Sequence, residues 1–309
     1  MRAAILSHID RPPVYGEHPG VLPLDGHIVA DVVAAGLHHL TRAHATGRHY
    51  SGALPLPLIP GVDGVVRDPH GALRYVALES TPTGTFADQT GFDIDRSIVL
   101  PPNADPVTIA AGMNPGMSSW VALRRRIRMP VGARVLVIGA TGAAGRLAVQ
   151  IAHLLGASHV TAAGRDAARL APLRALGPHS VVTLDDLTAA ADVDVVLDYV
   201  WGEPVASALV PMLMRRRDRS APLRWIQLGS MAGVTAAIPA AALRSSQLEL
   251  IGSGIGAVPA AEIVAELPAL AEAFVSGALT IPVRAVPLSD VEQHWTDAGS
   301  DRIVFQPAG

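Results

Sequence analysis

The second half of the chain alternates between short apolar runs and helical patterns, and this alternation constrains the fold more than any other feature. Val135–Ile138 precedes the helical pattern Ala143–Leu155, and Val160–Ala163 precedes Ala167–Leu176. Such alternation is typical of a parallel sheet covered by helices on both faces. Further apolar strand candidates are Val181–Leu184, Val193–Leu197, Trp225–Leu228 and Leu250–Ile251. The sequence therefore predicts an α/β fold with a doubly wound parallel sheet.

The first third of the chain has a different pattern. Its apolar segments Ile28–Val33, Leu73–Leu78 and Ile98–Leu100 are short and are separated by Pro, Gly and Asp, which predicts β-structure with long loops. The apolar segment Ile303–Phe305 near the chain end is interpreted as a strand that returns to this first domain. A length of 309 residues is consistent with two domains.

Glycines follow the first predicted strand at the point where a helix begins. The segment reads Gly139-Ala140-Thr141-Gly142-Ala143-Ala144-Gly145. Small residues let backbone N–H groups approach a pyrophosphate, and the positive end of the helix faces the phosphates. The spacing is Gly-x-x-Gly-x-x-Gly, because Ala140 stands where the usual fingerprint has glycine. In this strand–turn–helix context we predict a dinucleotide site rather than a purely structural turn.

The second strand of this region indicates which nucleotide binds. An acid for the ribose hydroxyls usually follows it, whereas here the strand ends in Gly164-Arg165. Gly164 leaves room for a 2′-phosphate, Arg165 offers it a bidentate guanidinium, and Arg169 supplies a second cation one turn on. We therefore predict NADPH. In the alternative interpretation, Arg165 is a solvated surface arginine and Asp166 only caps the next helix.

The composition excludes several chemistries. The chain has no cysteine, and all 24 of its basic residues are arginine, which excludes thiol nucleophiles, thiolate metal sites and a Schiff-base lysine. The arginine runs Arg124–Arg126 and Arg215–Arg217 each follow a predicted helix, Ser118–Leu123 or Val205–Met214, where cations favour the helix dipole. With a net charge of −3, we expect solvated helix ends and no nucleic-acid partner.

Four histidines lie close together in the first domain, and their spacing argues against a metal site. They are His38, His39, His44 and His49. His39 and His44, and likewise His44 and His49, are five residues apart, whereas metal ligands on one helix prefer positions i and i+4. We expect no metal here.

Neither a secretion signal nor a membrane span is expected. Met1–Asp10 has only a very short apolar patch, and the uncharged stretch Trp225–Leu243 contains Gly and Pro that would break a spanning helix. The expected location is the cytoplasm.

The order of several short motifs resembles the medium-chain dehydrogenase/reductase superfamily, and within it the zinc-independent quinone-oxidoreductase-like branch. The similarity covers almost the whole chain. Besides the glycine loop and its helix, it rests on Met1–Ala4, Ala34–Leu37, Pro57–Gly64, Gly84–Ala87 and Asn114–Trp120. The zinc-dependent members have Gly-His-Glu where this chain has Gly61-Val62-Asp63, and the quinone reductases have asparagine where it has His38.

This resemblance implies a Rossmann domain that binds NADPH and a GroES-like β-barrel domain built from both chain ends. We expect the Rossmann domain over residues 113–280 and the GroES-like substrate domain over residues 1–112 with 281–309. The resemblance also implies that Ser118, Gly229 and Ser230 lie beside the ribose and nicotinamide, and that Leu250–Gly256, including Gly254, contacts the ring. It further implies a homodimer.

The expected reaction is hydride transfer from NADPH to a small-molecule substrate: a quinone, an enone or a related activated double bond. A developing oxyanion needs a hydrogen-bond donor, for which the candidates are Tyr50, His49, His38 and Asn114. Tyr50 is the first choice because many family members have a tyrosine near it; alternatively, it packs on the proline run. Two other functions stay open: an NADPH-dependent ketone or imine reductase on the same scaffold, and a weakly active NADPH-sensing or RNA-binding protein.

Overall fold

The computed structural model describes residues 1–22, 25–50, 52–78, 81–297, 299 and 301–308. The chain forms two compact units, Met1–Pro115 with Ala260–Gly309, and Gly116–Pro259. The family resemblance implies divisions after residues 112 and 280, whereas the two compact units divide after Pro115 and Pro259, and the helical stretch that begins at Pro259 lies mostly in the first unit. The assignment of substrate to one unit and NADPH to the other stays a prediction.

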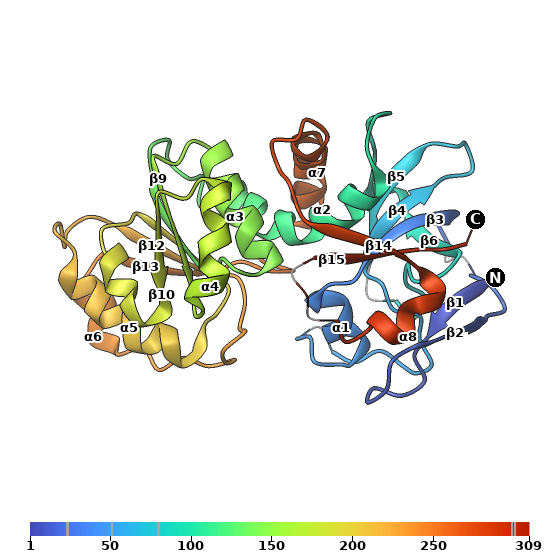
Figure 1. Ribbon diagram of the computed structural model, residues 1–309, viewed down its shortest axis with the longest axis horizontal. Helices are drawn as coiled ribbons and strands as arrows, with labels where there is room; N and C mark the ends of the chain where they lie inside the picture. Colours follow the sequence, from blue (N-terminus) through green and yellow to red (C-terminus); the bar gives the residue numbers. More distant parts are fainter. Residues whose placement is uncertain (23–24, 51, 79–80, 298, 300, 309) are drawn as a thin grey trace. The chain divides into compact units, whose positions relative to one another are not determined.

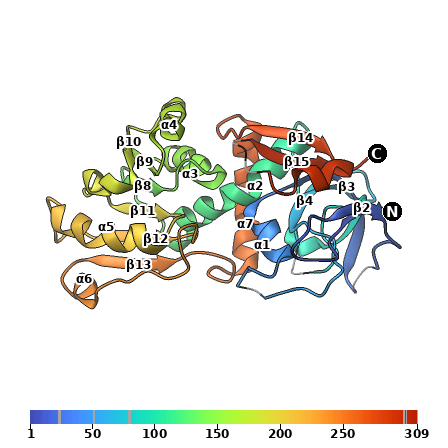
Figure 2. The same cartoon turned by 60° about the horizontal axis from the view of Figure 1, so that its bottom comes forward.

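The second unit contains a six-stranded parallel sheet in the order β10-β9-β8-β11-β12-β13. Figure 2 shows the strands in this order, from β10 above to β13 below. Numbered within the unit, the order is 3-2-1-4-5-6, which is that of the Rossmann fold. All six predicted strands are present: β8 (Arg134–Ile138), β9 (His159–Gly164), β10 (Ser180–Thr183), β11 (Val195–Asp198), β12 (Leu223–Gln227) and β13 (Leu248–Gly252).

Helices connect these strands and cover the sheet. Helix α3 (Ala143–Leu154) joins β8 to β9, and α5 (Gly202–Arg215) joins β11 to β12. The two connections run outward in opposite directions from the sheet centre, and right-handed crossovers then put the helices on opposite faces. Helix α4 (Ala167–Leu170) continues as a 3₁₀ helix, and α6 (Ala240–Arg244) is short. The predicted doubly wound fold is therefore confirmed.

The first unit is mainly antiparallel β-structure (Figure 1). A long central strand, β3 (His27–Gly36), pairs with β4, β6 and β15. The predicted return of the chain end is confirmed, since Phe305 of β15 pairs with Ala35. The strands of this unit are β1 (Arg2–Ile5), β2 (Val14–Glu17), β3, β4 (Asp63–Arg67), β5 (Leu73–Ala77), β6 (Gln89–Asp93), β7 (Ser97–Val99), β14 (Val283–Pro287) and β15 (Arg302–Gln306).

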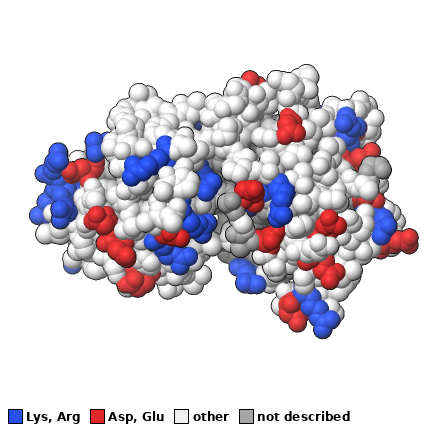
Figure 3. Space-filling view, viewed as in Figure 1, with Lys and Arg blue, Asp and Glu red and all other residues white. Residues whose placement is uncertain are grey.

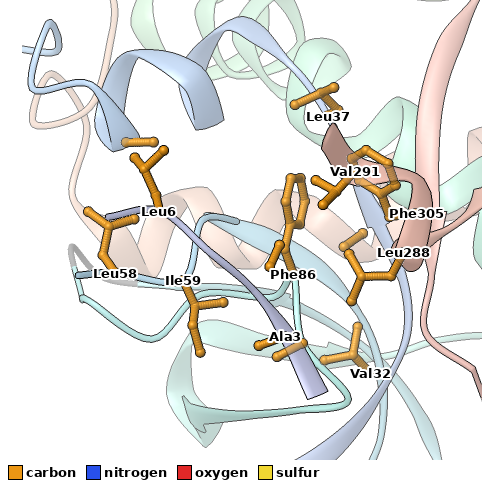
Figure 4. Close-up of a cluster of buried hydrophobic side chains, with 14 of the residues drawn as sticks. Ala3, Leu6, Val32, Leu37, Leu58, Ile59, Phe86, Leu288, Val291 and Phe305 are labelled. Atoms are coloured by element: carbon orange, nitrogen blue, oxygen red, sulfur yellow. The ribbon is translucent and has the colours of Figure 1, made fainter. Parts of the chain in front are cut away.

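One core joins the two ends of the chain in this unit. The rings of Phe86 and Phe305 meet edge to face with centroids 5.0 Å apart, and Trp295 lies at right angles to Phe86. Figure 4 shows Phe86 between Phe305 and the side chains of Leu6 and Ile59. The helices are α1 (His39–Ala45), α7 (Ala260–Val275) and α8 (Val291–His294).

Helix α2 (Pro106–Val121) begins earlier than the sequence indicates. The pattern predicts a helix only from Ser118, but the helix runs through Pro115 and continues as a π-helical turn over Ala122–Arg126. The end of β3 packs directly against α2, because a Cβ added to Gly36 would lie 2.4 Å from the Ala110 carbonyl oxygen. In the part of the chain that the structure describes, no helix is long and apolar enough to cross a bilayer.

Candidate cofactor site

The glycine loop lies where the strand order of the parallel sheet reverses. Strands β8 and β11 are neighbours, with Ile138 opposite Asp198, and their connections leave in opposite directions. Gly139 follows β8 with φ +90°, and a Cβ added there would lie 3.2 Å from the Cβ of Tyr199. Ligands of open α/β sheets bind outside the carboxyl ends of the strands at such a switch point. The predicted dinucleotide loop thus occupies the expected edge of the sheet.

Close backbone packing explains the last glycine of the loop. A Cβ on Gly145 would lie 2.3 Å from the Gly139 carbonyl oxygen and 2.6 Å from the Ala140 Cα. Helix α3 begins directly after Gly142, which supplies no side-chain cap to its first N–H groups. These N–H groups have no acceptor within the helix, so they suit an anion. The cradle therefore fits a pyrophosphate.

The residues predicted for the 2′-phosphate lie beside this loop. Gly164 ends β9, and a Cβ added to it would lie 3.0 Å from the Thr141 Cγ2. Arg165 and Arg169 are exposed. Asp166 caps α4 by accepting a hydrogen bond of 2.8 Å from the Ala168 N–H. Asp166 is thus a cap, as the alternative interpretation required, and the same geometry leaves the neighbouring Arg165 guanidinium in solvent.

A tyrosine that the sequence reasoning did not select connects several predicted residues. The Tyr199 hydroxyl lies 3.0 Å from the Ser118 Oγ, and a Cβ on Gly229 would lie 2.8 Å from the Tyr199 carbonyl oxygen. Burial raises the pKa of Tyr199 to about 12, so the phenol stays protonated. The sequence feature that could have identified Tyr199 is its position directly after a predicted parallel strand, where ligands of such sheets bind. The structure thus brings Ser118, Gly139 and Gly229 together around Tyr199.

Two further predicted residues lie in loops at the same edge of the sheet. Ser230 follows β12 and Gly254 follows β13, and both are exposed. The adjacent pairing of β12 with β13 puts their loops side by side.

Asp198 closes the turn after β11. Its Oδ1 accepts hydrogen bonds from the Val200 and Trp201 N–H groups at 2.8 and 2.9 Å, and its Oδ2 accepts one from the Trp225 indole at 3.0 Å. Burial raises the pKa of this carboxyl, and the three hydrogen bonds oppose the shift. Both carboxylate oxygens of Asp198 therefore accept hydrogen bonds that hold the turn after β11. Trp201 has φ 51° there, a conformation that L-residues rarely adopt.

The candidate proton donors lie in the first unit and have different surroundings. His38 is buried, with Nε2 at 2.6 Å from Asp63 Oδ1, and its Nδ1 accepts the Thr41 N–H at 3.3 Å. Tyr50 is 71% exposed and lies against the ring of His49, which stacks on His44 with centroids 4.2 Å apart. Asn114 is partly buried in α2. His49 and Tyr50 therefore lie together, whereas His38 belongs to a separate buried network.

Two arginines of the predicted runs, Arg126 and Arg217, have structural partners. Among the described residues, no group of three or more His, Asp or Glu side chains is arranged to hold a metal ion. Arg126 donates to the Gly252 carbonyl at 3.0 Å, and Arg217 pairs with Asp192 at 3.0 Å. The arginine runs thus make contacts at the helix ends.

Comparisons with known proteins agree with this architecture. The chain is 27% identical to the probable NADPH-dependent quinone reductase tdiC of Emericella nidulans, over 99% of this chain and 100% of that protein. A mycobacterial quinone oxidoreductase structure superposes with a TM-score of 0.84 at 18% identity, covering 99% of this chain and 100% of the other.

The quinone oxidoreductase of Thermus thermophilus, whose structure was also determined with NADPH, superposes with a TM-score of 0.77 at 24% identity, over 99% of this chain and 100% of that chain. The chain therefore has the fold of these quinone oxidoreductases and is similar over its full length to a probable NADPH-dependent quinone reductase. No family model matches it.

Proposed function

We propose that this protein is an NADPH-dependent oxidoreductase that transfers a hydride to a quinone, an enone or a related activated double bond, without a catalytic metal. The observation that carries the proposal is the meeting of Gly139–Gly145, Gly164 and Tyr199 at the switch point of the parallel sheet. The full-length similarity to a probable NADPH-dependent quinone reductase supports the choice of cofactor and substrate class.

Each part of the cradle has a role in holding the cofactor. The N–H groups at the start of α3 bind the pyrophosphate, and Gly164 with Arg165 and Arg169 binds the 2′-phosphate. Ser118, Gly229, Ser230 and Gly254 border the ribose and nicotinamide. When bound, NADPH supplies the hydride. The Tyr199 phenol lies within hydrogen-bond distance of Ser118, at the edge where β8 and β11 end.

A hydrogen-bond donor would stabilise the negative charge that develops on the substrate oxygen. Tyr50 is the preferred donor because its side chain is exposed and its ring lies against the ring of His49. His49 and Asn114 are the other candidates. His38 has both ring nitrogens engaged, so its contribution is to position the start of α1 rather than to give up a proton.

The proposal that the activity needs no metal is based on which residue types the chain has. Zinc-dependent relatives of this scaffold use Cys and a Gly-His-Glu histidine, and this chain has no cysteine and has Val62 at the histidine position. The expected enzyme therefore keeps full activity in EDTA.

The deciding experiment is an anaerobic NADPH-oxidation screen at 340 nm with quinones, enones and simple ketones, each with and without EDTA. Turnover of quinones or enones, but not of ketones that lack a conjugated double bond, supports the proposal. Preferential turnover of simple ketones would assign the alternative reductase activity. NADPH binding with no oxidation across the panel, together with RNA binding that needs the arginine runs, would assign the sensing function.

Assembly and location form part of the same proposal. We propose a cytoplasmic homodimer, and light scattering of the purified protein tests the assembly.

A further inference from the structure

A cavity lies in the Rossmann unit, away from the candidate cofactor site. Its volume is about 240 Å³, and it is bordered by the end of α5, the start of β12 and helix α6. Leu223, at this cavity, is the first residue of β12, whereas Gly229 follows the last residue of the same strand. A strand of five residues separates the two ends by about 13 Å. The cavity is therefore at the opposite edge of the sheet from the glycine loop.

The walls of the cavity are mainly apolar. Leu213, Leu223 and Ala242 are buried members of the core between the sheet and α5, and Val210 and Met214 extend the apolar surface. Burial of a hydrocarbon chain against such a surface is favourable by about 0.8 kcal/mol per CH₂.

The charged residues of the lining are both cations. Arg216 and Arg219 line the cavity, and the described lining residues include no acid. Figure 3 shows arginine side chains gathered at the left end of the view, where Figure 1 has the loops beside α6. An apolar cavity with cations at one side suits an amphipathic anion.

One N–H group of the buried Arg216 guanidinium has no hydrogen-bond acceptor among the described residues. The residue is only 8% exposed, and its Nη1 and Nη2 donate to the carbonyl oxygens of Ala191, Val193, Ala221 and Pro222 at 2.5–3.3 Å. Its buried Nε–H has no acceptor among the described residues. A buried donor without a partner costs about 1–3 kcal/mol.

No carboxylate in the described chain forms an ion pair with Arg216. Asp218, two residues further along the chain, is exposed and accepts the Ser220 hydroxyl at 2.6 Å. The Ser220 hydrogen bonds, and to a smaller extent the charge of Arg216, lower the pKa of Asp218, so this carboxylate stays ionised. The guanidinium charge of Arg216 is otherwise balanced only by backbone carbonyl groups.

We propose that this cavity binds a small amphipathic carboxylic acid, with its hydrocarbon chain against Leu213, Leu223 and Ala242 and its carboxylate at Arg216 and Arg219. A cavity of about 150 Å³ holds benzene, with six carbon atoms, so 240 Å³ accommodates about ten non-hydrogen atoms. Octanoate has this size. The site is separate from the proposed oxidoreductase site and does not depend on it.

Isothermal titration calorimetry with octanoate, octan-1-ol and acetate tests the site. Octanoate is expected to bind saturably and with the same Kd in saturating NADPH. Octan-1-ol lacks the charge and acetate lacks the chain, so each should bind at least tenfold more weakly. Equal binding of octanoate and octan-1-ol, no binding of octanoate, or displacement of octanoate by NADPH would overturn the proposal.

Variants locate the binding. Arg216→Met should weaken octanoate binding at least tenfold, and Arg219→Ala about threefold to tenfold, since a charge-assisted hydrogen bond is lost in each. Arg215→Ala, at an exposed position of α5 outside the cavity, is the matched control and should leave the Kd unchanged.

A substitution that fills the cavity with a larger side chain tests the site without removing the buried charge of Arg216. Ala241 is exposed and lines the cavity, so Ala241→Trp should preserve the fold and abolish octanoate binding. Undiminished binding to Ala241→Trp would contradict the assignment whatever the behaviour of Arg216→Met.

Discussion

His38 and Asp63 form a buried pair, with 2.6 Å between Nε2 and Oδ1. The Nδ1 of His38 accepts the Thr41 N–H, so the neutral ring carries its proton on Nε2 and donates it to Asp63. The other oxygen of Asp63 accepts the Tyr75 hydroxyl at 2.7 Å. Burial, and secondarily the Asp63 charge, raises the pKa of Tyr75 well above its ordinary value. The carboxylate thus holds together the start of α1, β4 and β5.

Removal of this carboxylate should destabilise the first unit. Asp63→Ala leaves two buried donors without an acceptor, and we expect a loss of about 3 kcal/mol in the free energy of unfolding. Tyr75→Phe removes one donor and leaves Asp63 paired with His38, so its loss should be about 1 kcal/mol. Urea unfolding followed by circular dichroism measures both. Asp10→Ala, at an exposed site, is the control. An Asp63→Ala midpoint equal to that of the control would show that the network contributes nothing.

Tyr50→Phe tests the proposed donor. The variant keeps the ring on His49 but removes the hydroxyl, so we expect kcat with an enone to fall by about tenfold to a hundredfold while the Kd of NADPH stays unchanged. Tyr15→Phe is the control, because Tyr15 lies under Arg2 in the β1–β2 pair. Unchanged turnover in Tyr50→Phe would leave Tyr50 with a packing role.

The glycine loop allows a matched pair of substitutions. Gly145→Ala would force a Cβ to 2.3 Å from a backbone oxygen, so we expect a loss of about 1–3 kcal/mol in stability and a large rise in the Kd of NADPH. Gly142→Ala adds a Cβ with no atom nearer than 3.6 Å, at φ −79°, and should leave stability within about 0.5 kcal/mol of the parent. Thermal unfolding and NADPH titration of both variants measure the difference. Equal losses in the two would remove the packing explanation.

The Rossmann unit was predictable from sequence because each of its strands is a nearly continuous apolar run between helices. The strands β1, β2, β4, β6 and β14 of the first unit were not predicted: they are short or mixed in polarity, and β6 reads Gln-Thr-Gly-Phe-Asp. The full length of α2 was not predicted either, because Pro115 lies within it and a proline usually indicates the end of a helix.

The site was predictable in part for a related reason. The glycines of the loop form a local motif that can be recognised in the sequence. The contact of His38 with Asp63 joins residues 25 positions apart, and no hydrophobic periodicity predicts it. Tyr199 follows a predicted strand directly, but its contacts with Ser118 and Gly139 depend on the pairing of β8 with β11, which a single-strand pattern does not show.

His44 should make the stability of the protein depend on pH. Burial, followed by the charges of His49 and His38, lowers the pKa of His44 to about 4, and its Nε2 is buried without a partner among the described residues. The unfolded chain, with a histidine pKa near 6.5, therefore takes up the proton first as the pH falls. Stability is fully present above about pH 6.5 and is lost towards pH 4, by up to about 3 kcal/mol from this group.

His44→Leu removes one histidine of lowered pKa and should reduce the slope of the urea midpoint against pH between pH 6.5 and 4. His8→Leu, at an exposed position, should keep the parent profile. Profiles of the same slope for the parent and His44→Leu would show that other groups carry the acid sensitivity.

Arg165 decides between the two interpretations of the end of β9. If its guanidinium binds the 2′-phosphate, Arg165→Asp replaces a bidentate charge-assisted contact by a repulsive carboxylate, and the Kd of NADPH should rise by about a hundredfold, equivalent to about 3 kcal/mol. NADH lacks this phosphate, so its Kd should change by less than about threefold. Arg174→Asp makes the same charge change at another exposed position of this unit and should leave both values unaltered. Because α4 keeps its Asp166 cap in the Arg165 variant, a solvated arginine would predict no effect on either nucleotide, and equal weakening of NADPH and NADH would place the lost contact elsewhere on the cofactor.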